Sequence, residues 1–242
     1  GGVGKSTTAV NLSAYLANLK KRVLLIDLDP QGNATSGVGT NKADTKKCIY
    51  HALLGETKIE KIIVNTGIEN LDIIPATIDL AGAEIELVTA ISRETKLKKV
   101  VEPIRQKYQY IFIDCPPSLG LLTINALTAA DEILIPIQCE YYALEGLGKL
   151  METIRLVKLN LNARLEIAGV LMTMHDKRTN LSKQVEDEVR KYFEDKVYKS
   201  VIPRTVRLSE APGFGQPIIL YAKNSKGAEA YKKLAREVVR RG

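Results

Sequence analysis

Glycines, a lysine and hydroxyl residues open the chain with the spacing of a phosphate-binding loop. The residues that match the end of the G-x-x-x-x-G-K-[ST] pattern are Gly1, Gly2, Val3, Gly4, Lys5, Ser6 and Thr7. Glycines let backbone N–H groups approach phosphate oxygens closely. Lys5 adds a positive charge over the outer phosphates, and the Ser6 hydroxyl can coordinate Mg²⁺. Because the motif runs into a helix with apolar periodicity, it favours a triphosphate site over a glycine-rich helix cap.

Three acidic residues follow two apolar runs. The run VLLID ends at Asp27, with Asp29 two residues later, and YIFID ends at Asp114. Carboxylates at the carboxyl ends of strands, beside a phosphate loop, face the nucleotide crevice. Residues i and i+2 of an extended segment point the same way. Asp27 and Asp29 could therefore both address one Mg²⁺, and Asp114 would hold it through water. A lone aspartate at a strand end is often only a turn cap, but three beside a phosphate loop favour a metal–nucleotide site.

These residues need a scaffold of short buried strands that alternate with helices. The predicted strands are Val23–Asp27, Leu71–Pro75, Tyr110–Asp114, Glu132–Ile137, Ile167–Thr173 and Val197–Ile202. Their apolar residues are continuous, as in strands covered on both faces. The predicted helices are Ser6–Leu19, Glu94–Tyr108, Thr123–Ala130, Leu144–Leu159, Ser182–Phe193 and Ser225–Val239. The alternation predicts an α/β fold, with a mostly parallel twisted sheet and helices on both faces, in a single domain over residues 1–242.

The composition fits a reducing compartment and shows a charge asymmetry. Three scattered cysteines, Cys48, Cys115 and Cys139, form neither a CxxC pair nor a zinc-ligand spacing. No apolar run reaches the roughly 18 residues that span a bilayer. The chain has 35 Lys/Arg and 28 Asp/Glu, a net charge of +7, and residues 176–242 have 16 and 9, which accounts for the whole excess. This asymmetry indicates a polyanionic partner, nucleic acid or an acidic membrane, or else a solvated basic surface.

Five segments together resemble one protein family. GGVGKSTT, DLDPQGNATSG, DCPPSLG, CEYYALEG and IPRTVRLSEAP are similar to motifs of the ParA/Soj partitioning ATPases, in the deviant Walker A, MinD-like branch of P-loop proteins. The resemblance covers nearly the whole chain. It implies a slow, Mg²⁺-dependent ATPase with ATP and Mg²⁺ as cofactors, which forms an ATP-bound homodimer and binds double-stranded DNA non-specifically. It further implies chromosome or plasmid segregation with a ParB-type partner, in the cytoplasm at the nucleoid.

The resemblance assigns roles to the residues of the phosphate site. Lys5 and the amides of Gly1–Gly4 would hold phosphate, and Ser6 would bind Mg²⁺. Asp29 would position or activate the attacking water, while Asp27 and Asp114 would tune the metal shell.

Two further residues are expected at the other end of the nucleotide. Pro203 and Thr205 are predicted adenine contacts, although Pro203 fits a strand end equally well.

The family pattern also places residues before the start of this sequence. In the family the loop reads KGGVGK[ST] and follows a strand, so we expect an N-terminally incomplete sequence whose first, central strand is missing. As written, such a chain would leave buried backbone groups unpaired and would fold poorly.

The same resemblance implies a function for the excess of positive charge. Arg178 and Arg207 match family positions assigned to non-specific DNA binding. Other cations that could widen this basic surface are Lys177, Arg204, Lys223, Lys226 and Lys233. No pattern for base reading is visible, so phosphate contacts are expected. The alternative for Arg178 is a simple ion pair with Asp176 or another surface acid.

Two rival functions remain open on the sequence alone. A MinD-type membrane ATPase needs a C-terminal amphipathic anchor. The stripe Ala228, Tyr231, Leu234, Ala235 and Val238 is rich in small residues and favours a helix packed on the sheet. A non-enzymatic DNA-coating protein would share the basic surface but would not need Asp29. Tyr141 and Tyr142 are expected to be packing residues.

Overall fold

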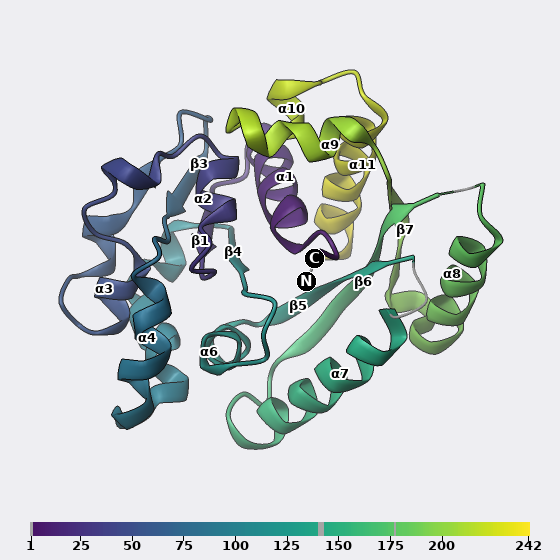
Figure 1. Ribbon diagram of the computed structural model, residues 1–242. Helices are drawn as coiled ribbons and strands as arrows, with labels where there is room; N and C mark the ends of the chain where they lie inside the picture. Colours follow the sequence, from purple (N-terminus) through teal and green to yellow (C-terminus); the bar gives the residue numbers. More distant parts are fainter. Residues whose placement is uncertain (1, 140–142, 177) are drawn as a thin grey trace.

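Seven strands form two sheets in the computed structural model, which describes residues 2–139, 143–176 and 178–242 (Figure 1). The first sheet has the order β2-β3-β1-β4 and the second the order β5-β6-β7. The strands are β1 (Val23–Asp27), β2 (Val64–Asn65), β3 (Leu71–Ile74), β4 (Tyr110–Asp114), β5 (Glu132–Gln138), β6 (Glu166–His175) and β7 (Val197–Pro203). All pairs are parallel except β2 with β3. The predicted mostly parallel α/β fold is confirmed.

The two sheets present unpaired edges to each other. In the described part of the chain, no backbone ladder joins β4 to β5. Figure 1 shows these strands as the inner borders of the two sheets. Tyr110 and Phe112 of β4 and Leu134 of β5 are only half-buried and pack against the same apolar core.

Helices surround the sheets in the order expected for strand–helix alternation. The longer ones are α1 (Lys5–Asn18), α6 (Leu121–Ala129), α7 (Ala143–Asn160), α8 (Asn180–Phe193) and α11 (Lys226–Arg241). The shorter ones are α2 (Asn33–Gly37), α3 (Ile49–Leu53), α4 (Leu80–Glu86), α5 (Lys96–Val101), α9 (Val206–Glu210) and α10 (Ile218–Tyr221). Short 3₁₀ turns lie between them, at Lys42–Asp44, Ile59–Ile62, Leu87–Thr89, Arg93–Thr95, Glu102–Lys107, Glu194–Lys196 and Ala211–Phe214.

Among the residues that the structure describes, three apolar clusters fill the space between these layers. One lies under α1 and α11, which pack against each other, and it contacts both sheets (Figure 1). A second joins the opposite face of the first sheet to α3, α4, α5 and α6. The third joins the second sheet to α7 and α8. Strands covered on both faces explain why their apolar residues are continuous in the sequence.

One predicted helix is wrong. The segment Glu94–Tyr108 contains only α5 as an α-helix and continues as a 3₁₀ turn over Glu102–Lys107. Pro103 stands at the start of that turn, where its ring and missing N–H prevent continuation of the α-helix. None of the helices in the described ranges is long and apolar enough to cross a membrane.

Candidate nucleotide-binding site

The glycine loop leads into the N-terminus of α1, where no side chain caps the first backbone N–H groups. Gly2 and Gly4 have φ values of 83° and 87°, in the left-handed region that glycine adopts at little cost. α1 begins at Lys5 directly after Gly4, and its first turn contains no acidic residue. The free N–H groups and the positive end of the helix dipole therefore suit an anion. Gly1, also predicted to bind phosphate, lies outside the described residues.

A cavity of about 370 Å³ opens over this loop. Its lining includes six of the predicted site residues, namely Gly2, Gly4, Lys5, Ser6, Thr7 and Asp29. The rest of the lining consists of Val10, Asn11, Gln31, Asn33, Gly37, Pro117, Met174, Ala211, Pro212 and Gln216. The cavity thus runs from the glycine loop to the 3₁₀ turn Ala211–Phe214. Val3 does not line it, but its carbonyl accepts a hydrogen bond from the Thr173 hydroxyl at 2.8 Å.

Asp114 lies at the end of β4, opposite Asp27 in the parallel register, and is 2% exposed. The Ser6 hydroxyl lies close enough to this carboxyl group to lower its pKa, and Oδ2 has no hydrogen-bond partner among the described residues. Burial raises the pKa of Asp114 to about 7, and the charges of Asp27 and Asp29 act in the same direction, against Ser6 and Lys5. A buried carboxylate oxygen without a partner calls for a cation or a water molecule.

Asp27 is fully buried and bonded on both oxygens. Its Oδ2 accepts hydrogen bonds from the Thr35 N–H and hydroxyl, each at 2.7 Å, and its Oδ1 accepts one from the Asp29 N–H at 3.1 Å. Burial raises the pKa of Asp27, although these hydrogen bonds oppose the rise. Thr35 in turn accepts the Ala76 N–H at 3.0 Å. Asp27 therefore fixes the segment that carries Asp29, and it does not line the cavity.

Asp29 lies at the edge of the cavity and is 7% exposed. Its Oδ1 accepts the Gln31 N–H at 2.9 Å. This bond holds the carboxylate in place in the cavity that Lys5 and Ser6 also line, and it leaves capacity for a further hydrogen bond.

These donors fit a magnesium ion bound together with a phosphate group. Magnesium keeps several waters and usually takes one or two protein oxygens plus phosphate. The Ser6 hydroxyl and the nearby Asp114 carboxyl group, whose Oδ2 has no partner among the described residues, supply this kind of shell. No group of three or more His, Cys, Asp or Glu side chains in the described ranges could hold a metal ion by protein ligands alone.

The two predicted adenine contacts lie where β7 ends and α9 begins. Pro203 is the last residue of β7, and Thr205 is the N-cap of α9, where its hydroxyl accepts a hydrogen bond from the Leu208 N–H at 3.3 Å. Neither is among the residues that line the cavity, so their contact with adenine stays a prediction.

Three contributors to the site were missed in the sequence. Thr173, at the end of β6, holds the glycine loop through Val3. Met174 lines the cavity with a φ of 50°, an uncommon value for a side-chain-bearing residue. Asn11 donates to the Thr7 carbonyl at 2.8 Å and accepts the Ile218 N–H at 2.6 Å, which ties α10 to α1. Asp29 and Asp114 could be found in the sequence because each is the polar residue that ends a segment rich in apolar residues, LLIDLD and YIFID. The polar end of the run GVLMTMH is the corresponding signal for Thr173.

The two arginines predicted to bind DNA lie away from the cavity lining, at the starts of α8 and α9. Arg178 is 88% exposed and makes a bidentate ion pair with Asp176. Arg207 is 61% exposed and pairs with Glu210 at 3.0 Å. The ion pair with Asp176 was the alternative left open for Arg178. Lys177, Tyr141 and Tyr142 lie outside the described residues.

Comparison with known proteins finds relatives over the full chain. A sequence family described as an AAA domain matches residues 1–167. The chain is 64% identical over 242 residues to the sporulation initiation inhibitor protein Soj of Bacillus subtilis (strain 168), covering 100% of this chain and 96% of that protein. It is 54% identical over 241 residues to the chromosome partitioning protein ParA of Myxococcus xanthus (strain DK1622), covering 100% and 85%.

Solved structures share the fold. The chain superposes with a TM-score of 0.87 and 38% identity on cobyrinic acid a,c-diamide synthase from Mycobacterium smegmatis with bound ATP analogue and magnesium, covering 99% of this chain and 91% of that one. It superposes with a TM-score of 0.84 and 28% identity on a putative plasmid partition protein from Borrelia burgdorferi B31 bound to AMPPNP, covering 100% and 96%.

Proposed function

The chain belongs to the ParA/Soj family of chromosome-partitioning ATPases, and we propose that ATP drives it into a dimer that binds DNA and segregates replicons with a ParB-type partner. It is an ATPase whose cofactors are ATP and Mg²⁺. The observation that best supports the proposal is that Lys5, Ser6, Asp29 and Asp114 lie close together at one glycine loop.

The proposed mechanism uses charge and position. Lys5 and the loop amides neutralise phosphate charge, which is the main requirement of phosphoryl transfer. Asp29 orients the attacking water from the cavity edge. Asp27 keeps Asp29 in place by accepting a hydrogen bond from the Asp29 backbone N–H. Bound Mg²⁺, held by Ser6 and through Asp114, would add further neutralisation. ATP hydrolysis by the protein alone is slow if one contact that activates the reaction is supplied only by a partner protein.

The dimer proposal has support in an exposed apolar surface beside the site. Ile85 of α4 is 77% exposed and Ile91 is 90% exposed. α4 lies against the loop that follows Asp114, since Glu84 closely approaches Gly120, and Pro117 of this loop lines the cavity. Covering this surface with a second copy would remove apolar area from water next to the nucleotide.

The DNA proposal depends on the exposed cations of the last quarter of the chain. Arg178 and Arg207 project from the starts of α8 and α9 into solvent. Two such side chains in one subunit would bind DNA weakly, and an ATP dimer would double the contacts, so that DNA affinity follows nucleotide state. A cytoplasmic protein associated with the nucleoid would result.

Measuring ATP turnover with Mg²⁺ tests this function. We expect slow hydrolysis by the protein alone and stimulation when duplex DNA and a ParB-type protein are added together. DNA binding without turnover would instead identify a DNA-coating protein. Co-sedimentation with ATP against DNA or anionic liposomes separates the proposal from a membrane ATPase, because only the DNA pellet should hold the protein.

A further inference from the structure

Both arginines proposed to contact DNA already hold a carboxylate of their own chain. Arg178 donates from Nε to Asp176 Oδ1 at 3.0 Å and from Nη2 to Oδ2 at 2.7 Å. Arg207 donates from Nη1 to Glu210 Oε2 at 3.0 Å. These guanidinium N–H groups are the ones that a DNA phosphate would use, because carboxylate and phosphate oxygens are recognised with the same geometry.

Asp176 is anchored independently of the Arg178 side chain. Its Oδ1 also accepts the Arg178 backbone N–H at 3.0 Å, and its carbonyl accepts the Thr179 N–H at 3.2 Å. The preceding residue, His175, contacts Glu186 of α8 at 3.0 Å. The Asp176 side chain is 25% exposed, whereas that of Arg178 is 88% exposed. Arg178 can therefore swing away while the carboxylate stays.

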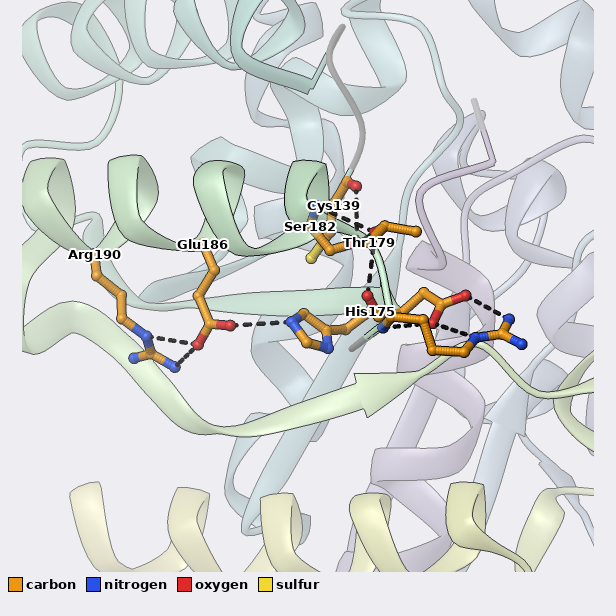
Figure 2. Close-up of polar contacts among 8 residues, drawn as sticks. Cys139, His175, Thr179, Ser182, Glu186 and Arg190 are labelled. Carbon is orange, nitrogen blue, oxygen red and sulfur yellow. Dashed lines mark hydrogen bonds and ion pairs between the residues drawn. The ribbon is translucent and has the colours of Figure 1, made fainter.

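Figure 2 shows how the start of α8 is fixed around this turn. Arg190 pairs with Glu186 at 2.8 Å, so that His175, Glu186 and Arg190 form a row that joins β6 to α8. Thr179 and Ser182 are bonded to each other, and the Ser182 hydroxyl reaches the Cys139 carbonyl at 3.5 Å. The row holds the end of β6 in place, and with it the neighbouring Asp176.

Glu210 has a comparable second anchor. The Tyr221 hydroxyl donates to the same Oε2 at 3.0 Å, and the Tyr221 ring stacks on Phe214 with centroids 4.9 Å apart. If Arg207 turned toward DNA, the Glu210 carboxylate would keep this bond. At both places a fixed negative charge remains beside the position where a phosphate would bind.

From this arrangement we infer that Asp176 and Glu210 set the affinity for DNA by competing with phosphate for Arg178 and Arg207. The inference deepens the proposed function and rests on its DNA-binding part. An exposed ion pair is only weakly stabilising, so a phosphate can displace the carboxylate. The displaced carboxylate then repels the phosphate, so each contact is weaker than that of an unpaired arginine. Firm binding consequently needs the several contacts that a dimer offers.

Charge-removing, near-isosteric variants test the inference. Asp176→Asn keeps an oxygen that can accept the Arg178 N–H, and Glu210→Gln keeps one for Tyr221. We expect each ATP-loaded variant to bind a short labelled duplex of arbitrary sequence about three- to tenfold more tightly than wild type at physiological salt, by fluorescence anisotropy. Affinity equal to or weaker than wild type for both variants overturns the inference.

Two controls separate competition from a general change in charge. Asp131→Asn removes a carboxylate from another exposed pair, in which Asp131 binds Arg105 at 2.6 Å, and should raise DNA affinity far less. The gain from Asp176→Asn should also vanish when Arg178 is alanine, because Asp176 acts through that side chain. An equal gain in the Arg178→Ala background would overturn the inference.

The same measurements distinguish failure of the inference from failure of the proposed function. If wild type binds DNA with ATP and Arg178→Ala weakens binding, but Asp176→Asn and Glu210→Gln do not tighten it, only the inference fails. If ATP-loaded wild type does not bind the duplex, the DNA-binding part of the proposed function fails and the inference fails with it.

Discussion

The three aspartates of the candidate site differ in how their oxygens are used. Asp27 is bonded on both oxygens within the protein, Asp114 keeps Oδ2 without a partner in the described ranges, and Asp29 faces the cavity edge. Only Asp29 combines a fixed position with access to a nucleophilic water over the phosphate loop. The three side chains therefore support three different roles, although they have the same chemistry.

Substituting Asp29 tests this division. Asp29→Ala should leave ATP binding close to wild type, because Lys5 and the loop amides remain, and should reduce turnover at least about tenfold. Binding is measured by titration calorimetry and turnover by phosphate release. Thr40→Ala, at a half-buried residue outside the cavity lining, is the matched control. Normal hydrolysis by Asp29→Ala would assign water positioning to another group.

How far single residues could be predicted depends on how locally their roles are determined. Lys5, Asp29 and Asp114 follow from short motifs, since a phosphate loop and strand ends fix where they lie. Thr35 could not be predicted, because its role depends on Ala76, 41 residues away. Pro203 and Thr205 stay predictions as adenine contacts, because a capping threonine and a proline at a strand end look the same in sequence as ligand contacts.

At the level of elements, α11 completes the hydrogen bonding of the outer strand. Glu237 is 5% exposed, and its carboxylate accepts the N–H groups of Lys199 at 2.8 Å and Ser200 at 2.9 Å. These groups belong to β7, the edge of the second sheet. Arg241 donates to the same carboxylate at 3.0 Å. A single side chain thus protects an edge strand and fixes the register of helix against sheet.

Glu237→Gln should lower the free energy of unfolding by roughly 1–3 kcal/mol, because an amide cannot accept both N–H groups equally well. Burial alone would raise the pKa of Glu237, but the Lys199 and Ser200 N–H groups and Arg241 lower it below the ordinary value. Its contribution is therefore complete above the unfolded-state pKa of about 4.3 and is lost as pH falls through the folded-state value.

Urea denaturation at several pH values measures this effect. The difference between wild type and Glu237→Gln should be largest near neutrality and should shrink below about pH 4. Glu229→Gln is the control, because Glu229 lies on the same helix in an exposed pair with Lys233, with side chains 65% and 66% exposed. A pH-independent difference would show that the carboxylate charge is not what stabilises β7.

Strong, periodic elements were predictable, and short or interrupted ones were not. β1 and β4 match their predicted limits, and α6, α7, α8 and α11 lie within two residues of theirs at each end. Helices of four or five residues such as α2, α9 and α10 carry no complete apolar period. The predicted helix from Glu94 was too long because periodicity outweighed Pro103 in the interpretation.

At the scale of the whole molecule, the separation of the two sheets is the feature that sequence patterning could not define. Each strand could be read from its own residues, but pairing depends on neighbours distant in the chain. β4 and β5 each leave one backbone edge without a strand partner in the described ranges. A parallel strand between them, running into the glycine loop, would pair both edges.

Adding an apolar, β-branched strand segment ahead of Gly1 should raise the free energy of unfolding by at least about 3 kcal/mol, since several backbone hydrogen bonds form and apolar surface is buried. Urea midpoints measure the change. An extension of the same length made of glycine and serine is the control, because it stays flexible. Equal midpoints for the two extensions would show that the space between β4 and β5 does not accept a strand.

The charge distribution of the whole molecule leads to a prediction about salt. The observed affinity for duplex DNA should fall linearly with salt on logarithmic axes, with a slope of about −0.9 per neutralised phosphate. In an ATP dimer each arginine counts twice, so Arg178→Ala should make the slope shallower by up to about 1.8. Lys20→Ala is the control, because Lys20 pairs with Glu69 in the electrically balanced part of the chain and both side chains are more than 70% exposed. It should leave the slope unchanged. An unaltered slope for Arg178→Ala, or an equal change for Lys20→Ala, would mean that DNA is held by diffuse positive charge and not by the surface at the start of α8.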